Sequence, residues 1–191
     1  MSDFQDEKAV VHAYQAAVDL ADPDAAASAI SAHVSDDYLW RGMHPFDIRR
    51  GAAEVAEVFW SPLKTALTSL TRREDIFMAG RNQMDDFQSV WVVSMGHLMG
   101  LHDASWLGIP ATRKIAFLRY AEFCKVEDGK VVETAMFCDI PHLMIQAGVN
   151  PFPPQTAAHM VQPGPVTHSG VMNDVQAPAE GDKTLALINA M

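Results

Sequence analysis

One carboxylate, Asp139, stands where an apolar strand-like segment meets an apolar helix-like segment, in AMFCDIPHLMIQAG, residues 135–148. Apolar surroundings disfavour the charged form of a carboxylate and move its pKa towards neutral, so that it can take and return protons. The same position also suits an ordinary helix cap, with Pro141 in the first turn. His142 lies within the same expected helix and could sit above Asp139, although packing explains it as well. Asp139 is therefore either the proton-handling group of a pocket or a helix cap.

A second candidate, His97, lies on a predicted strand in a row that it shares with apolar side chains only (Trp91, Val93, Met95 and Met99). A lone histidine in such a row is more often a core residue than a catalyst. His97 is thus either packed core or a hydrogen-bonding or proton-shuttling partner. We expect His102, which follows in a turn, to be exposed to solvent.

Ionisable residues also interrupt the apolar strand FLRYAEFC, residues 117–124. Because side chains alternate along a strand, Tyr120 and Glu122 share one face and Arg119 lies on the other. A buried ionisable residue tends to mark a site, which favours Tyr120 and Glu122 as the pair that faces a cavity. An outward salt bridge at a subunit interface is the alternative.

Several aromatic residues could form the walls of a pocket. A flat apolar ligand needs flat apolar walls with few polar groups, although such residues are usually core. Trp40 and Trp60 are the preferred pocket candidates. The remaining members of the group are Tyr38, His44, Trp91 and Trp106.

Composition and missing motifs exclude several functions. The net charge of −10 and the pI near 5.1 argue against nucleic acid or an anionic membrane as a partner. No GxSxG, P-loop or GxGxxG motif is present, which disfavours a serine nucleophile and nucleotide chemistry. Cys124 and Cys138 lack the spacing of metal ligands and fall in apolar segments, so we expect free thiols in a reducing cytoplasm.

Hydrophobic periodicity predicts helices first and strands afterwards. Helices are expected over residues 5–20, 24–34 and 51–67, the last with a proline-induced break near Trp60, and the segment between the second and third helices reads as irregular with a turn at His44-Pro45. Strands are expected over 71–82, 87–100, 113–127 and 130–139, with Asp128-Gly129 as a hairpin turn. This order predicts an α+β fold with helices on one face of a curved antiparallel sheet, and a partner subunit on the other face.

The composition changes after Gly148. The segment that follows is rich in proline and reads as an extended arm, whereas DKTLALINAM at residues 182–191 is again helical and apolar on one side. We therefore expect one domain over residues 1–148 and a Pro-rich arm with a terminal helix over 149–191. That helix could pack on the core, on another subunit or as the start of a second domain.

Residues 95–148 carry a series of short motifs in a characteristic order. They are His97 with Gly100, GIPAT at 108–112, DGKV at 128–131, Asp139 and QAG at 146–148. Each motif is weak alone, but the order and spacing resemble the SnoaL-like polyketide cyclases, or ester cyclases, of the NTF2-like superfamily. Arg113 departs from the pattern, since the family usually has glycine there.

The resemblance covers about residues 5–148 and implies a cone-shaped sheet around a deep apolar pocket, closed by three helices, in a protein that dimerises through the outer sheet face. It also implies catalysis without metal or organic cofactor: an aspartate at the position of Asp139 acts as general acid and base in an intramolecular aldol condensation, with His97 as its partner. The implied substrate is a small apolar, polyketide-like molecule that bears carbonyl groups.

Two functions remain open on the sequence. The chain is either a cofactor-independent acid–base enzyme, including related isomerases, dehydratases and hydrolases, or a non-catalytic module that binds a hydrophobic ligand or dimerises. The first hypothesis requires Asp139 and His97 to point into one cavity.

Overall fold

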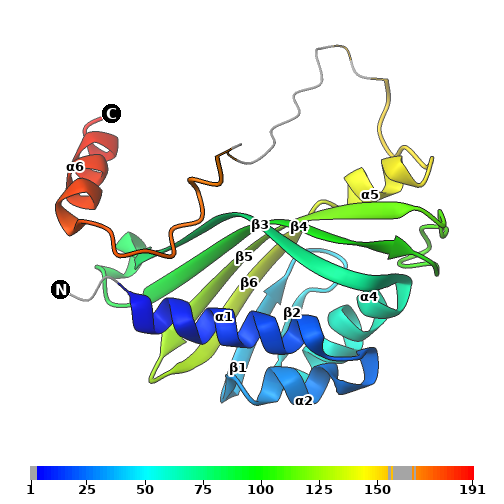
Figure 1. The fold of residues 1–191 in the computed structure, drawn as a ribbon, viewed down its shortest axis with the longest axis horizontal. Coiled ribbons are helices and arrows are strands. Elements are labelled where there is room, and N and C mark those ends of the chain that lie inside the picture. Colours follow the sequence, from blue (N-terminus) through cyan, green and yellow to red (C-terminus); the bar gives the residue numbers. More distant parts are fainter. Residues whose placement is uncertain (1–3, 155, 157–164, 166) are drawn as a thin grey trace.

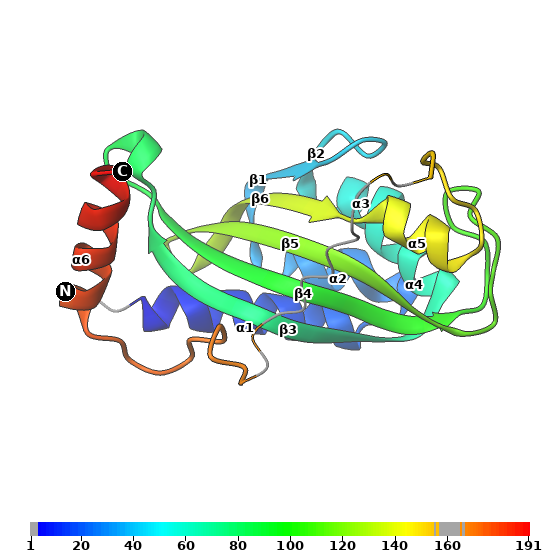
Figure 2. The same cartoon turned by 90° about the horizontal axis from the view of Figure 1, so that it is seen from above.

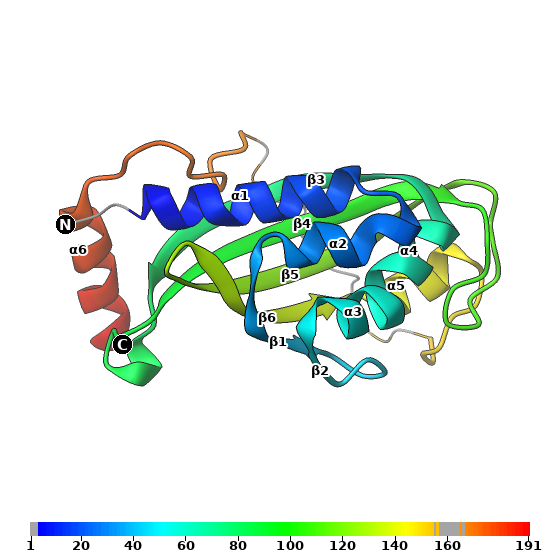
Figure 3. The same ribbon diagram turned by 90° about the horizontal axis from the view of Figure 1, so that it is seen from below.

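The computed structural model describes residues 4–154, 156, 165 and 167–191. Helices on one side and a six-stranded sheet on the other form its two layers (Figure 1). The order of strands across the sheet is β2-β1-β6-β5-β4-β3. The sheet is curved and unclosed, and helices α1 to α4 cover only one of its faces, as the views from above and below show (Figures 2 and 3).

Helix α1 (Gln5–Leu20) has the predicted bounds and buries Val11, Tyr14 and Val18 against the sheet. The second predicted helix divides into η1 (Pro23–Ala25) and α2 (Ala26–Ser31). The third is continuous but contains a π-helical turn: α3 (Gly51–Val55), η2 (Ala56–Trp60) and α4 (Ser61–Ala66). Pro62 lacks an N–H group and lies in the first turn of α4, which explains why the regular α pattern is interrupted just before it.

Four long antiparallel strands confirm the predicted meander: β3 (Leu67–Arg81), β4 (Val90–His102), β5 (Ile115–Glu127) and β6 (Lys130–Cys138). A short 3-10 helix, η3 (Gln83–Asp85), joins β3 to β4. Asp128 and Gly129 both have positive φ in the β5–β6 turn, as an Asp-Gly hairpin requires. Residues on β4 and β5 alternate between fully and partly buried, because one face packs against helices and the other does not.

The segment predicted to be irregular contains two strands instead, β1 (Val34–Gly42) and β2 (Ile48–Arg50), which flank the expected turn at His44-Pro45. Strand β1 pairs with β6 in parallel, so the sheet is mixed and the prediction of a purely antiparallel sheet is wrong at this strand. The pairing joins residues about a hundred positions apart, and local patterning carries no information about it.

Helix α5 (Ile140–Gln146) follows β6 at the end of the sheet. Beyond it, part of the predicted arm (residues 155, 157–164 and 166) lies outside the described residues. Residues 170–172 add a short parallel pairing to the edge of β3 through Phe77, and the predicted terminal helix is present as α6 (Pro178–Asn189). Helix α6 stands apart from the two layers (Figure 1). None of the described helices combines the length and the hydrophobicity that a membrane-spanning helix needs.

Candidate functional site

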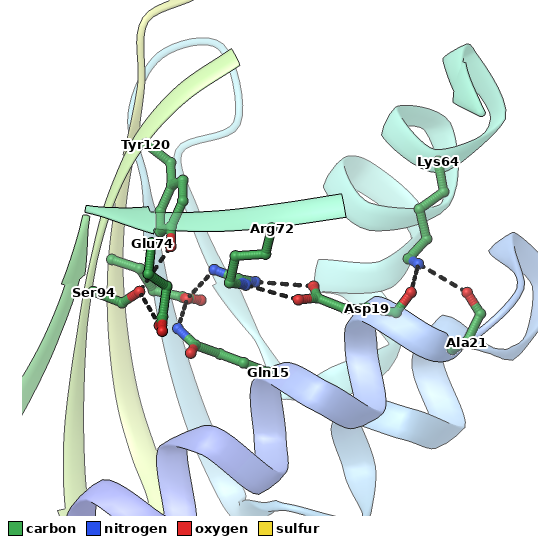
Figure 4. A network of polar contacts seen from close by, with 9 residues as sticks. Gln15, Asp19, Ala21, Lys64, Arg72, Glu74, Ser94 and Tyr120 are labelled. Atoms are coloured by element: carbon green, nitrogen blue, oxygen red, sulfur yellow. Dashed lines mark hydrogen bonds and ion pairs between the residues drawn. The ribbon is translucent and has the colours of Figure 1, made fainter. Parts of the chain in front are cut away.

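A buried guanidinium, that of Arg72, lies at the centre of a polar network between α1 and the sheet (Figure 4). Its Nε and Nη2 atoms donate to the two carboxylate oxygens of Asp19, at 2.9 and 3.2 Å, and its Nη1 donates to Glu122 Oε2 at 3.0 Å. The Arg72 side chain is only 6% exposed. A planar fork with several donors can serve two carboxylates in this way, whereas an ammonium group cannot do so with the same geometry.

Two aromatic rings complete the surroundings of Arg72. The guanidinium carbon lies 4.9 Å from the ring centroid of Tyr120 and 5.7 Å from that of Trp60. Burial alone would lower the pKa of Arg72, but Glu122 and Asp19 outweigh burial and raise the pKa well above its ordinary value. The guanidinium therefore stays protonated and fixes a positive charge inside the fold.

Glu122 on β5 is the carboxylate with the most unusual environment. It is fully buried, and its Oε2 accepts hydrogen bonds from Gln15 Nε2, at 2.8 Å, and from Arg72. Its other oxygen, Oε1, has no hydrogen-bond partner among the described residues. Burial raises the pKa of Glu122 above the ordinary value, although Arg72 and Gln15 act in the opposite direction. A carboxylate with one free oxygen and a raised pKa can accept and return a proton.

The network continues along the sheet through Tyr120. The hydroxyls of Tyr120 and Ser94 lie 2.8 Å apart, and the Ser94 hydroxyl donates to Glu74 Oε1 at 3.0 Å. Burial raises the pKa of Tyr120 to about 12, so its hydroxyl stays protonated at neutral pH.

Two further tyrosines, Tyr14 on α1 and Tyr38 on β1, lie in the same interior and are fully buried. Burial is the main cause that raises the pKa of each, and the neighbouring Glu122 adds to it. Their hydroxyls also interact with each other, and that of Tyr38 interacts with Thr134. Buried polar groups are nearly always paired, so the unpaired Oε1 of Glu122 requires a functional explanation.

Asp139, the first candidate from the sequence, has the geometry of a helix cap. Its Oδ1 accepts a hydrogen bond from the backbone N–H of His142 at 3.0 Å, at the start of α5. Its backbone N–H donates to the carbonyl of Arg119. The side chain is partly buried and, within the described part of the chain, makes no hydrogen bond or ion pair with Glu122 or Arg72.

His97 lies on the opposite face of the sheet. Its Nδ1 is 3.1 Å from Asp75 Oδ2, and its ring meets Phe117 edge-on. On β4 the helix-facing positions are those of Ser94, Gly96 and Leu98, and alternation therefore turns His97 away from the helices. The predicted catalytic pair requires Asp139 and His97 to meet in the interior. The structure does not bring them together there.

The other sequence candidates divide between the same two faces. Tyr38, Trp40, Trp60, Tyr120 and Glu122 are all buried on the helix side. Trp91 shares the outer face with His97 and donates to the Ser89 hydroxyl, and His44 is exposed in its turn, so neither contributes to the interior. The reasons are strand alternation for Trp91 and a surface turn for His44.

Sequence reasoning missed Arg72, Gln15 and Asp19, and it placed His102 in solvent although His102 is fully buried. Arg72 stands in the charged run TRRED, which reads as an exposed strand. A weak signal existed on α1, where Gln15 and Asp19 are four residues apart next to apolar Tyr14 and Val18.

The cavities that open on the outer sheet face and beside the helices both lie outside the polar network. One, of about 490 Å³, lies on the outer sheet face between Met78, Trp91, Phe123 and Phe137. The other, of about 650 Å³, lies against the helices and is bordered by Ala56, Ser61, Thr65 and Ser105, among others. Within the described residues, no three His, Cys, Asp or Glu side chains are arranged to hold a metal ion.

No protein-family profile matches the chain, and no curated protein matches it. Solved structures do match. AclR from Streptomyces galilaeus, provisionally named a hydroxylase, aligns with 78% of this chain and 100% of its own, at a TM-score of 0.58 and 18% identity. A protein from Jannaschia sp. CCS1, provisionally named a SnoaL-like polyketide cyclase, aligns with 79% of this chain and 95% of its own (TM-score 0.52, 16% identity).

An NTF2-like protein from Burkholderia thailandensis E264 aligns with 74% of this chain and 95% of its own, at a TM-score of 0.52 and 24% identity. These matches agree with the helices over one face of a curved sheet and confirm the predicted fold. The chain has the α+β NTF2-like fold that is also found in SnoaL-like polyketide cyclases.

Proposed function

We propose that this protein is a cofactor-independent acid–base enzyme that acts on a small, apolar molecule bearing carbonyl groups, with Glu122 as the proton acceptor. The observation on which the proposal rests is the unpaired, buried Oε1 of Glu122, with the buried tyrosines Tyr14 and Tyr38 close to this carboxylate. The likeness in fold to proteins provisionally named polyketide cyclases supports this class of substrate.

The proposed chemistry begins with Glu122 Oε1, which removes a proton from a carbon next to a carbonyl group. Negative charge then develops on the carbonyl oxygen, and the hydroxyls of Tyr14 and Tyr38 can donate hydrogen bonds to it. Both hydroxyls keep their protons because burial raises their pKa values. Ring closure would follow when the enolate carbon attacks a second carbonyl, and Glu122 would return its proton to the new alkoxide. Isomerisation or dehydration could use the same groups.

A second candidate is a binding module without catalysis. Arg72 bonds to Glu122 at 3.0 Å and stabilises its ionised form, and large aromatic side chains fill much of the surrounding interior. A permanently paired carboxylate would hold α1 onto the sheet and would have no part in proton transfer.

The test compares Glu122→Gln with Asp139→Asn over a panel of aromatic and ring-forming ketoesters. Glutamine keeps the hydrogen bonds of Glu122 but cannot accept the proton, and asparagine keeps the helix cap. We expect Glu122→Gln to lose at least about a hundredfold in turnover, with ligand binding by thermal shift retained, and Asp139→Asn to stay near wild type.

The opposite pattern, with turnover lost only in Asp139→Asn, would return the catalytic role to the aspartate that the family resemblance implies. If wild type binds members of the panel but turns none of them over, the binding module is the better description. The two buried free thiols, Cys124 and Cys138, also lead us to propose a reducing compartment such as the cytoplasm.

A further inference from the structure

Three tryptophans surround one phenylalanine next to the polar network. The ring centroid of Phe59 lies 5.1 Å from that of Trp60, 5.5 Å from that of Trp40 and 6.2 Å from that of Trp106. All four side chains are at most 3% exposed. We call Trp40, Trp60 and Trp106 the indole cluster.

Every indole N–H of this cluster lacks an acceptor among the described residues. The fourth tryptophan, Trp91 on the outer face, donates its N–H to the Ser89 hydroxyl at 2.8 Å. Tryptophan N–H groups normally find a partner when they are buried, because desolvation without a hydrogen bond is unfavourable. The three tryptophans that pack around Phe59 thus share the same unusual feature, a buried N–H group without an acceptor among the described residues.

The position of Trp60 joins the indole cluster to the proposed catalytic groups. Its ring packs against Phe59 on one side and lies 5.7 Å from the guanidinium carbon of Arg72, which in turn binds Glu122. Phe59 and Trp60 also stand on the π-helical turn η2. Such turns are rare and occur frequently at functional sites.

An approach from solvent lies beside the same turn. The cavity of about 650 Å³ against the helices is bordered by Ala56 at the start of η2, by Ser61 just after it, and by Ser105, the neighbour of Trp106. The cavity is thus bordered by Ser61 and Ser105, which are the sequence neighbours of Trp60 and Trp106.

We propose that the indole cluster is a subsite that binds a carbonyl oxygen of a flat, uncharged aromatic ligand. Neutral N–H donors between apolar rings match a neutral acceptor, and Arg72 offers no free charge to a carboxylate because Asp19 and Glu122 already bind it. The subsite rests on the proposed function in one respect: it would orient a second carbonyl-bearing part of the substrate relative to Glu122.

The test uses fluorene and 9-fluorenone, which have the same flat skeleton and differ by CH₂ against C=O. Fluorenone has no proton on a carbon next to its carbonyl, so its binding does not depend on whether Glu122 catalyses anything. We expect fluorenone to bind about three- to tenfold more tightly than fluorene, which corresponds to one net neutral hydrogen bond. In ¹H–¹⁵N spectra, at least one indole N–H signal of the cluster should move downfield with fluorenone only, and that of Trp91 should stay in place.

The variant Trp60→Phe keeps a flat apolar ring and removes one donor, and Trp91→Phe is its matched control. Trp60→Phe should abolish the preference for fluorenone if Trp60 is the donor that responds, and Trp91→Phe and Glu122→Gln should retain it. Equal binding of the two probes by wild type, absence of binding, or unmoved indole signals would each overturn the subsite. Should Glu122→Gln leave turnover intact while fluorenone still shifts the indoles, the catalytic proposal fails and the subsite stands.

Discussion

Arg72 is the central side chain of the polar network, because it forms ion pairs with both Asp19 and Glu122. Removing it would leave Glu122 buried without its positive partner, a more serious loss than that of an exposed ion pair. Neighbouring Arg73 offers a matched control, since its side chain is 58% exposed and its Nε lies 3.7 Å from Asp75.

We expect Arg72→Met to lower the free energy of unfolding by about 3–5 kcal/mol, and Arg73→Met to change it by about 1 kcal/mol or less. Arg72→Lys should recover only part of the loss, because an ammonium group cannot reproduce the fork geometry. Urea denaturation measures all three. If Arg72→Met lowers the free energy of unfolding as little as Arg73→Met does, the network does not stabilise the fold.

His97, on the outer face of the sheet, should make the stability of the fold depend on pH. Burial lowers its pKa below the ordinary 6.5, Arg119 and Arg73 act in the same direction, and Asp75 opposes them. Between the folded-state pKa and 6.5, the unfolded chain therefore binds more protons at this residue than the folded chain does. Its contribution to stability is complete above pH 6.5 and decreases as the pH falls through this range.

The variant His97→Gln, which can still bond to Asp75, should accordingly lose less stability than wild type between pH 7 and pH 5. Urea denaturation at several pH values checks this. Parallel curves for the two proteins would contradict the prediction. His102, whose pKa burial also lowers, remains in both proteins, so only the difference between the curves reports His97.

At the scale of elements, the docking of the C-terminal arm depends on one glycine. A Cβ atom on Gly170 would lie 2.6 Å from the carbonyl oxygen of Asp75, too close for the arm to keep its position beside β3. The Phe77 N–H donates to the Gly170 carbonyl at 2.8 Å, and Lys8 Nζ holds the carbonyl of Met172 at 2.7 Å.

We therefore expect Gly170→Ala to expose the Phe77 amide, with hydrogen exchange there faster by on the order of tenfold. Gly181→Ala in α6 is the control, because a Cβ there meets nothing within 4 Å. The prediction is wrong if both variants protect Phe77 as well as wild type does.

Local sequence patterns account for most of the helices and strands. The bounds of α1 and the β3–β6 meander follow from local periodicity and from the Asp-Gly turn, and both are confirmed. Strands β1 and β2 were missed because SDDY is polar at its start and because the pairing of β1 with β6 is distant in sequence. The break predicted near Trp60 exists, but as a π turn within a continuous helix.

Across the whole molecule, the two faces of the sheet differ in what covers them. Helices cover one face only, and apolar side chains line the other, including Met78 (42% exposed) and Phe137 (54% exposed) beside Trp91, Val93 and Phe123. We propose that this face binds a second copy of the chain, as the family resemblance implies, because contiguous apolar surfaces of this kind mark interfaces.

A charge at the centre of this face should separate the two copies. We expect wild type to sediment as a dimer and Phe137→Glu as a monomer in analytical ultracentrifugation, with the monomer still folded by circular dichroism. Leu20→Glu serves as the control, since Leu20 is 87% exposed at the end of α1 and away from this face. A monomeric wild type at micromolar concentration would overturn the proposal.

The sequence by itself determined the fold class, the two-layer order of helices and strands, and the alternation that placed Tyr120 and Glu122 on one face. These features depend on local spacing, which the chain carries in every conformation. It could not determine which face the helices would cover, and so it could not separate Glu122 from His97 as the interior group.

Only the tertiary structure decided that question, because burial, and with it the pKa of a carboxylate, depends on residues far apart in the chain. Gln15, Arg72 and Glu122 come from a helix and two strands that meet only in the folded protein. Asp139 had the more suggestive local sequence, but the folded chain uses it to cap α5 and places the unpaired carboxylate oxygen at Glu122.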